Sequence, residues 1–190
     1  MNQLDKLLTK YPFGVLTDFE KDSLGFILYK LSKSEISDQR QQAYVIATIK
    51  HETSDTYRPI KEYGGEHYLT SKKYYPYIGR GFVQLTWDYN YKKFGDILRI
   101  DLLGQPELAQ NPEIAWKILE LGMTKGLFTG ECLSDYFNND ETDFYHARRI
   151  INGMDRAELI KEYAENIYKI ISVIEEIPEP RPPDFPQDAT

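Results

Sequence analysis

Apolar residues along most of the chain recur with the three- and four-residue spacing of amphipathic helices, so helices dominate the expected structure. A capping box, Thr17-x-x-Glu20, predicts where the first clear helix begins. A second helix is predicted over 38–52, and apolar residues on several of its faces indicate deep burial. The sequence Asn-Pro-Glu at 111–113 predicts a third helix start, with the helix running to about Lys125.

The second half of the chain contains two further helical patterns. A helix is predicted around 142–151, and Asp155-x-x-Glu158 has the form of a capping box for the last helix. The expected apolar face of that helix consists of Leu159, Tyr163, Ile167, Ile170, Ile171 and Ile174. The proline-rich segment 178–190 cannot continue a helix, so we expect a single domain over 1–177 followed by an extended or disordered tail.

One region between the helices lacks helical periodicity. Residues 53–77 are polar and rich in tyrosine and glycine, which predicts a loop around a functional site. Gly79 and Gly81 then interrupt the chain before a short apolar run, 82–85, which is predicted to be a strand.

Composition narrows the classes of protein that fit. The 190 residues, with 41% hydrophobic and 28% charged side chains, are typical of one soluble globular domain, for which a monomer is the default expectation. A net charge of −7 without a basic face argues against binding to nucleic acid. The single Cys132 excludes an internal disulfide, and three histidines leave little material for a metal site, so neither metal nor cofactor is expected.

The amino terminus carries acids and lysines rather than a long apolar run. This pattern predicts neither a secretory signal nor a stable membrane insertion, so we expect synthesis in the cytoplasm. Action outside the cytoplasm would then depend on release by another route.

Two glutamates lie near the start of the polar region 53–77, Glu52 directly before it and Glu62 within it. Glu52 ends the predicted 38–52 helix, where the negative end of the helix dipole and apolar neighbours favour the protonated form that a general acid needs. Glu62 lies beside Lys61 and near two glycines, a wetter setting that favours the ionised form of a general base. Such a pair is what glycoside hydrolysis requires. The alternative is two ordinary surface glutamates, and Glu66 is a rival candidate for the base.

The stretch 77–91 supplies groups suited to holding a sugar. Gln84 and Asn90 carry both hydrogen-bond donors and acceptors, which suits sugar hydroxyl and acetamido groups. Thr86 could cap a helix, take part in the chemistry, or do both. Trp87 is expected in the core or on the floor of a cleft rather than as an exposed stacking surface.

Two nearby residues have structural interpretations. Arg80, between two glycines, could bind a ligand, but an arginine that pairs with a buried acid is the commoner arrangement. His51 is expected to be a packed or hydrogen-bonded histidine. The helical zinc motif needs a second histidine four residues after the first, and this chain has Asp55 there.

Two segments together resemble glycoside hydrolase family 19, which contains plant and bacterial chitinases and a group of phage endolysins. The first is His51-Glu52-Thr53, and the second is Tyr77-x-Gly-Arg-Gly-x-x-Gln-Leu-Thr-Trp-x-Tyr-Asn-Tyr91. Further matches at 101–103, at 111–112 and at 150–153 follow in the family's order, so the resemblance extends well beyond one short motif.

The resemblance implies a mainly α, lysozyme-like α+β fold, in which a helical bundle and a small β-sheet flank the active-site cleft. It implies an inverting glycosidase in which Glu52 matches the general acid and Thr86 matches the residue that helps to hold the nucleophilic water; Glu62 is our choice of base. The substrate-binding residues it implies are Tyr77, Gln84, Trp87, Asn90 and, in a late loop, Asn152.

Two departures from the plant enzymes shape the predicted function. The loop between acid and base is shorter and the plant disulfides are absent, which together point toward the endolysin-like branch. We therefore predict an endo-β-1,4-glycosidase that cleaves the glycan strand of peptidoglycan. The nearest rival function is that of a chitinase acting on β-1,4-linked N-acetylglucosamine polymers. The same residues would also fit a carbohydrate-binding protein without catalysis, or a toxin-type effector with the same chemistry.

Overall fold

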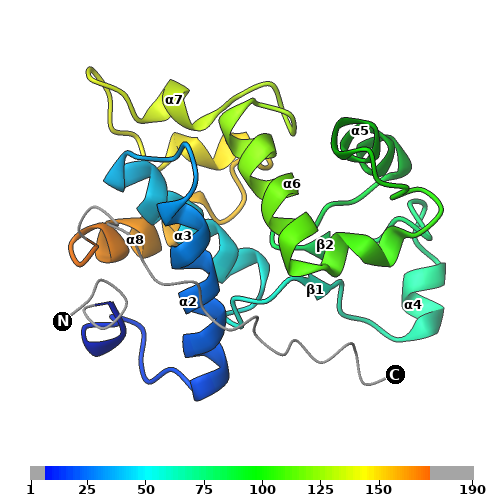
Figure 1. The fold of residues 1–190 in the computed structure, drawn as a ribbon, viewed down its shortest axis with the longest axis horizontal. Coiled ribbons are helices and arrows are strands. Elements are labelled where there is room, and N and C mark those ends of the chain that lie inside the picture. Colours follow the sequence, from blue (N-terminus) through cyan, green and yellow to red (C-terminus); the bar gives the residue numbers. More distant parts are fainter. Residues whose placement is uncertain (1–6, 172–190) are drawn as a thin grey trace.

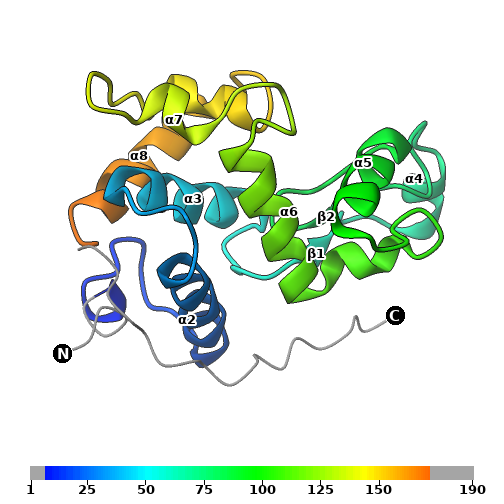
Figure 2. The ribbon, with the colours of Figure 1, turned by 45° about the horizontal axis from the view of Figure 1, so that its top comes forward.

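A computed structural model describes residues 7–171 of the chain, which form a larger helical part and a smaller part joined through α6 (Figures 1 and 2). The helical part contains α2 (Asp18–Ser32), α3 (Gln39–Glu52), α7 (Leu133–Tyr136), the 3-10 helix η2 (His146–Ile150) and α8 (Ala157–Tyr168). The smaller part contains β1 (Ile60–Lys61), α4 (Glu66–Thr70), β2 (Arg80–Gly81), α5 (Asp88–Leu98) and the 3-10 helix η1 (Pro106–Gln110). Helix α6 (Pro112–Thr124) lies between them. The mainly helical fold with a small sheet is therefore confirmed.

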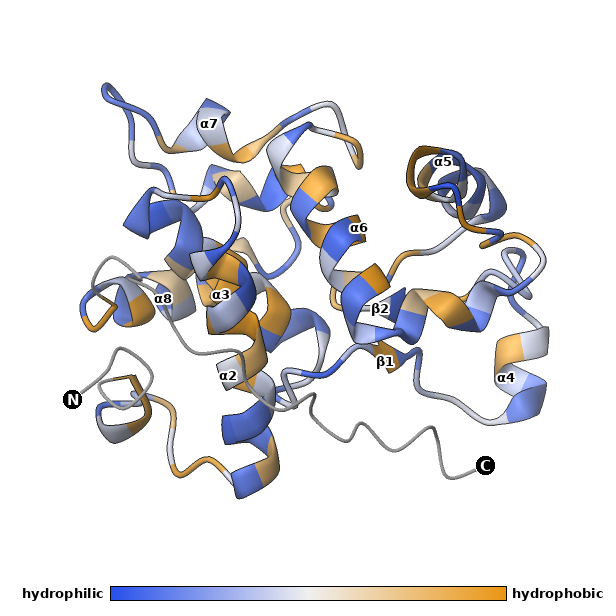
Figure 3. Cartoon of the chain, in the orientation of Figure 1, coloured by the Kyte–Doolittle hydropathy of each residue, from blue (hydrophilic) through white to orange (hydrophobic). Residues whose placement is uncertain are grey.

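Helix α3 forms the centre of the helical part. All its residues from Gln42 to Lys50 are buried, and α8 packs against it, as the apolar pattern on several faces predicts. Hydrophobic residues gather along parts of α2 and α3 (Figure 3), and buried residues of both helices belong to one hydrophobic core. The helix begins as predicted, because the side chain of Asp38 accepts a hydrogen bond from the backbone N–H of Arg40.

The predicted starts of α2 and α6 are both confirmed. Thr17 and Glu20 form the reciprocal capping box at the start of α2. The side chain of Asn111 accepts hydrogen bonds from two backbone N–H groups in the first turn of α6. An ion pair between Lys30 and Glu113 joins the two helices at the surface.

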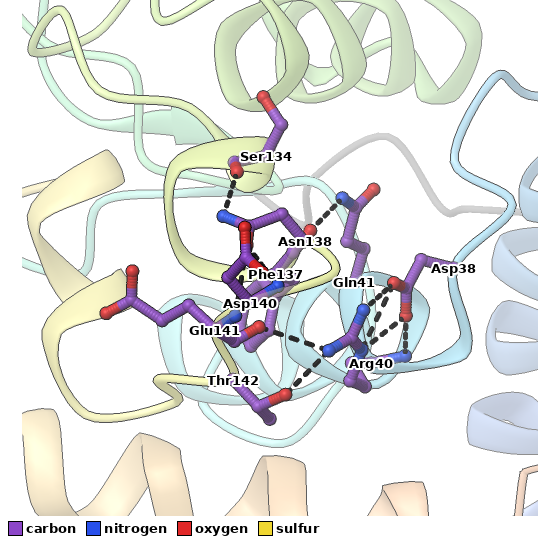
Figure 4. A network of polar contacts seen from close by, with 9 residues as sticks. All are labelled: Asp38, Arg40, Gln41, Ser134, Phe137, Asn138, Asp140, Glu141 and Thr142. Carbon is purple, nitrogen blue, oxygen red and sulfur yellow. Dashed lines mark hydrogen bonds and ion pairs between the residues drawn. The ribbon is translucent and has the colours of Figure 1, made fainter.

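A hairpin-like loop after α7 is fixed to the start of α3 (Figure 4). The Nη1 of Arg40 donates to the carbonyl oxygen of Glu141 at 3.1 Å and to the hydroxyl of Thr142 at 2.6 Å. The amide of Gln41 donates to the carbonyl oxygen of Phe137 at 3.1 Å. These contacts hold the polar loop against α3, at the end of the helix opposite to Glu52.

The position of the strands differs from the prediction. Strands β1 and β2 are antiparallel, with Ile60 opposite Gly81 and Lys61 opposite Arg80, so the strand lies two residues before the predicted run 82–85. The chain turns at 82–84 because Gly81 has a positive φ of 85°, and an isolated bridge then pairs Arg80 with Leu85. A side chain at Gly81 would also stand 2.8 Å from the carbonyl oxygen of Ala109, which explains the glycine.

The predictions for the last third of the chain need correction. Helix α8 begins at Ala157 after Arg156, which has a left-handed backbone, and no side chain caps it; Asp155 and Glu158 do not form a capping box. The helix predicted around 142–151 is only the short η2. The residues of α8 that are buried are Ala157, Ile160, Ala164 and Ile167.

Two expectations fall on residues that the structure does not describe. The end of the predicted apolar stripe at Ile174 and the proline-rich segment 178–190 both lie outside 7–171. Within the described range, no helix has the length and apolar character needed to cross a membrane.

Replacing Asn111 by Ala should destabilise the fold by about 1 kcal/mol, because two N–H groups at the start of α6 lose their acceptor. Urea denaturation followed by circular dichroism measures this change. Asn111→Asp keeps an acceptor oxygen and places a negative charge at the helix start, so its stability should stay close to wild type. Equal loss in both variants would contradict the capping explanation.

Candidate active site

Glu52 is the last residue of α3, and its carboxyl group is fixed by a buried arginine. The Nη1 of Arg148, in η2, donates to Glu52 Oε1 at 2.6 Å, and the side chains of Arg148 and Glu52 are only 4% and 14% exposed, respectively. The Nε of Arg148 donates to the carbonyl oxygen of Asp155 at 3.0 Å, which fixes the guanidinium itself. The sequence predicted apolar neighbours for Glu52. In the structure its carboxyl group also contacts a cation, Arg148, which the sequence did not reveal.

His51 precedes Glu52 and is half-buried. Burial lowers the pKa of its imidazole, and the nearby Arg148 acts in the same direction, whereas the charge of Glu52 opposes both. In the part of the chain that the structure describes, no group of three or more His, Cys, Asp or Glu side chains is arranged to hold a metal ion.

Glu62 directly follows β1 and is bound on both carboxylate oxygens. Its Oε2 accepts from the backbone N–H of Gly79 at 3.1 Å, and its Oε1 accepts from the hydroxyl of Tyr74 at 2.9 Å. Its own N–H donates to the carbonyl oxygen of Gly79 at 2.7 Å and extends the pairing of the sheet by one residue. Its rival Glu66 is the exposed first residue of α4. The geometry favours Glu62, and the assignment of the base stays a prediction.

Tyr74 is a residue of the site that sequence analysis missed. Burial raises the pKa of its hydroxyl to about 12, and the hydrogen bond to Glu62 adds to the increase, so the phenol remains a donor at neutral pH. Its ring also makes an edge contact with Trp87, with the ring centroids 5.3 Å apart. Nothing in the tyrosine-rich segment 53–77 distinguishes this tyrosine from its neighbours, because the contact depends on how the loop folds.

Gln84, Thr86 and Asn90 form a linked set beside the sheet. The amide of Gln84 donates to the carbonyl oxygen of Ile60 at 3.1 Å, and Thr86 donates to the carbonyl oxygen of Gln84 at 2.8 Å. The amide of Asn90 donates to the carbonyl oxygen of Thr86 at 2.9 Å, while its buried Oδ1 has no hydrogen-bond partner. These donors support the backbone around β1 and β2. Thr86 does not cap α5, since Trp87 occupies the cap position.

The position of Trp87 differs from the prediction. Its side chain is 39% exposed rather than buried in the core, and its ring stacks on that of Tyr89 at a centroid distance of 6.2 Å and an angle of 21°. Tyr89 is 59% exposed, so the two rings form a flat surface accessible to solvent. The reason is a backbone with φ 75° at Trp87, which turns the chain into α5.

Tyr77 and Arg80 support the loop between α4 and α5. Tyr77 packs against Tyr91 with the ring centroids 5.4 Å apart, and its hydroxyl donates to the carbonyl oxygen of Leu103 at 3.3 Å. Arg80 is buried, and its Nη1 donates to the hydroxyl of Tyr91 and to the carbonyl oxygens of Pro76 and Ile78. In the contacts of the described residues Arg80 thus binds neutral oxygens, and the expected pairing with a buried acid is wrong.

Asn152 lies in a separate segment. It is exposed, four residues after Arg148, and its Oδ1 accepts from the backbone N–H of Gly153 at 2.8 Å. The predicted residues thus form two groups: those from Glu62 to Asn90 on the smaller part of the molecule, and Glu52 and Asn152 on the helical part. Their roles in binding or chemistry stay predictions.

Curated proteins similar to this chain include plant endochitinases. A basic endochitinase of Brassica napus is 37% identical over 89 residues, covering 42% of this chain and 33% of that protein. An acidic endochitinase of Populus trichocarpa is 27% identical over 150 residues, covering 60% of this chain and 44% of that protein. The chain thus spans less than half the length of these curated relatives. No family model matches the chain.

Solved structures of chitinases share the fold. Chitinase C from Streptomyces griseus is 27% identical with a TM-score of 0.55, and the match covers 87% of each chain. A bacterial family 19 chitinase, 23% identical with a TM-score of 0.55, covers 90% of this chain and 93% of its own; this likeness concerns the fold alone. In sequence and in fold, the chain is thus similar to chitinases, and a family 19 chitinase is among the solved structures that share its fold.

Proposed function

We propose that this chain is an endo-acting chitinase that hydrolyses β-1,4-linked N-acetylglucosamine polymers with two carboxyl groups. The observation that carries the proposal is the placement of these groups. Glu52 ends the buried helix α3, whereas Glu62 extends the sheet of the smaller part with both of its oxygens bound. The two carboxyl groups thus come from different elements, and inverting glycosidases use two carboxyl groups that flank the scissile bond.

The proposal gives the two carboxyl groups different roles. Glu62 accepts hydrogen bonds on both oxygens, which supports a carboxylate that takes a proton from water. Glu52 would protonate the glycosidic oxygen as its bond to the sugar breaks, while the water that Glu62 deprotonates attacks the anomeric carbon from the opposite face. The contact from Arg148 occupies Oε1 of Glu52, so in the reacting complex the proton is carried by Oε2 or the arginine contact opens.

We assign substrate binding to the exposed aromatic surface beside Glu62. The stacked rings of Trp87 and Tyr89 offer a flat face for a sugar ring, and the edge contact of Tyr74 connects this face to Glu62. The unpartnered Oδ1 of Asn90 and the exposed amide of Asn152 offer further acceptors and donors for acetamido and hydroxyl groups.

The choice of chitin over peptidoglycan rests on the relatives and on charge. The curated relatives named above are endochitinases, and the solved relatives are chitinases. The net charge of −7 would repel an anionic cell wall but not a neutral polysaccharide. The short loop and the absence of disulfides are the sequence features that favoured peptidoglycan as the substrate. They concern the size and covalent structure of the protein and not its recognition of sugars. Release to a bacterial cell wall, through a holin-type pore or a secretion system, stays a proposal that rests on the sequence alone.

Digestion of chitin hexasaccharide and of purified peptidoglycan, with the products analysed by mass spectrometry, tests this function. Wild type should release shorter chitin oligomers, and Glu52→Gln should lose at least about a hundredfold in kcat because it cannot donate the proton. Glu66→Gln, a matched exposed change, should retain near wild-type activity. Disaccharide muropeptides as the only product would show that the substrate is peptidoglycan and not chitin. Absence of product from both polymers would favour a binding protein.

Tyr74→Phe should lower kcat by about tenfold with little change in KM, because the carboxylate of Glu62 loses one of the two donors that orient it. Steady-state kinetics on the same oligomer measures the effect. The neighbouring Tyr75, which is 51% exposed, provides the control Tyr75→Phe, with kinetics expected to match wild type. A rise in KM alone in Tyr74→Phe would assign Tyr74 to binding and not to orientation of the base.

Trp87→Leu should raise KM by up to about tenfold, since it removes the flat ring but keeps an apolar side chain at the surface. Binding of chitin oligomers to the Glu52→Gln variant, measured by calorimetry, separates affinity from turnover. Tyr63→Leu removes another exposed ring, 65% accessible, and should leave the affinity unchanged. Equal losses in both variants would indicate nonspecific contact with exposed aromatic residues.

A further inference from the structure

The chain leaves α3 through a turn whose residues seldom adopt its backbone conformation. Directly after Glu52 and Thr53, Ser54 has φ 50° and Asp55 has φ 70°, and Tyr57 follows with φ 56°. Positive φ is unfavourable for residues other than glycine, because the Cβ approaches the backbone too closely. The turn therefore needs compensating contacts, and it adjoins the proposed catalytic acid.

The hydrogen bonds of this turn are those of a Schellman motif. The N–H of Asp55 donates to the carbonyl oxygen of Lys50 at 2.9 Å, and the N–H of Ser54 donates to that of His51 at 3.2 Å. In this motif the position of Ser54 is usually glycine, and an apolar contact usually joins the positions that Lys50 and Asp55 occupy here. In this chain that contact is an ion pair, with Lys50 Nζ 2.6 Å from Asp55 Oδ1.

The ammonium group of Lys50 is held in an aromatic cage. Its side chain is only 5% exposed, and Nζ lies 4.6 Å from the ring centroid of Phe13 and 4.8 Å from that of Tyr163. Aromatic faces attract a cation, and the attraction strengthens when water is excluded. Segment 7–16, α3 and α8 thus meet at one charge, which forms an ion pair with Asp55.

A second contact fixes the far side of the turn. The hydroxyls of Tyr11 and Tyr57 lie 2.6 Å apart, and the N–H of Tyr57 donates to the side chain of Thr53 at 3.0 Å. Tyr57 is fully buried, so the turn cannot move independently of the residues packed around it.

We propose that Lys50 is a positioning residue for Glu52: by holding Asp55, it keeps the strained turn closed and fixes the last residue of α3 relative to the substrate. This inference rests on the catalytic role proposed for Glu52. The cage places a buried cation two residues before the acid, where its ion pair is with the turn. Loss of Lys50 should therefore affect turnover rather than binding.

Lys50→Met is the variant that tests this role. Methionine has a similar length and packs well against aromatic rings, so the cage should remain filled and the protein folded. We expect kcat on chitin hexasaccharide to fall by about tenfold with KM within about twofold of wild type, since a small displacement of a catalytic group impairs reaction more than binding. Hydrogen exchange at the amides of Ser54 and Asp55 should become faster.

Adding Ser54→Gly to Lys50→Met should restore both measurements, because glycine adopts the left-handed conformation without strain. Lys21→Met, which removes an exposed lysine paired with Asp18 on α2, is the matched control and should change neither kcat nor the exchange rates. Recovery of slow exchange without recovery of kcat in the double variant would overturn the inference, as would wild-type kcat in Lys50→Met.

These results are distinguishable from failure of the proposed function. A wild-type protein that cleaves neither chitin nor peptidoglycan would remove the proposed function, and the positioning role would fall with it. An active wild type whose turnover does not depend on Lys50 would overturn the positioning role alone and leave the assignment of Glu52 intact.

Discussion

Burial of α3 on all its faces is the constraint on which the rest of the structure depends. Because the middle of this helix has no solvent-facing side, its neighbours must pack around it, and both of its ends are then fixed. At the first end, Arg40 and Gln41 hold the polar loop after α7. At the other end, Arg148 holds Glu52. The same helix thus joins the core to the proposed chemistry.

The smaller part of the molecule is organised differently. A sheet of two-residue strands contributes little stability, so hydrogen bonds between side chains and the main chain replace the missing ladder. Arg80 donates to the carbonyl oxygen of Pro76, before β2, and Gln84 donates to a carbonyl oxygen of β1, while Glu62 accepts from the N–H of Gly79. The base proposed for the reaction is therefore also part of what holds this region together.

Tyrosine hydroxyls form contacts between separate segments of the chain. The hydroxyl of Tyr91 donates to the carbonyl oxygen of Ile78 at 2.7 Å, and that of Tyr11 lies beside Tyr57. Burial raises the pKa of Tyr91 and of Tyr11 to about 12, so these hydroxyls stay neutral even in alkaline solution near pH 10. The tyrosine content thus serves loop anchoring as well as the stacking surface at Tyr89.

The sequence by itself determined the helix starts at Thr17 and Asn111 and the placement of Glu52 at a helix end, because these depend on residues within one or two turns. Its family resemblance also predicted the mainly helical fold. Only the tertiary structure decided that Arg148, 96 residues away, pairs with Glu52, that Tyr74 orients Glu62, and that Trp87 is exposed. Such contacts arise from packing between distant segments, which local patterns of apolar and polar residues do not encode.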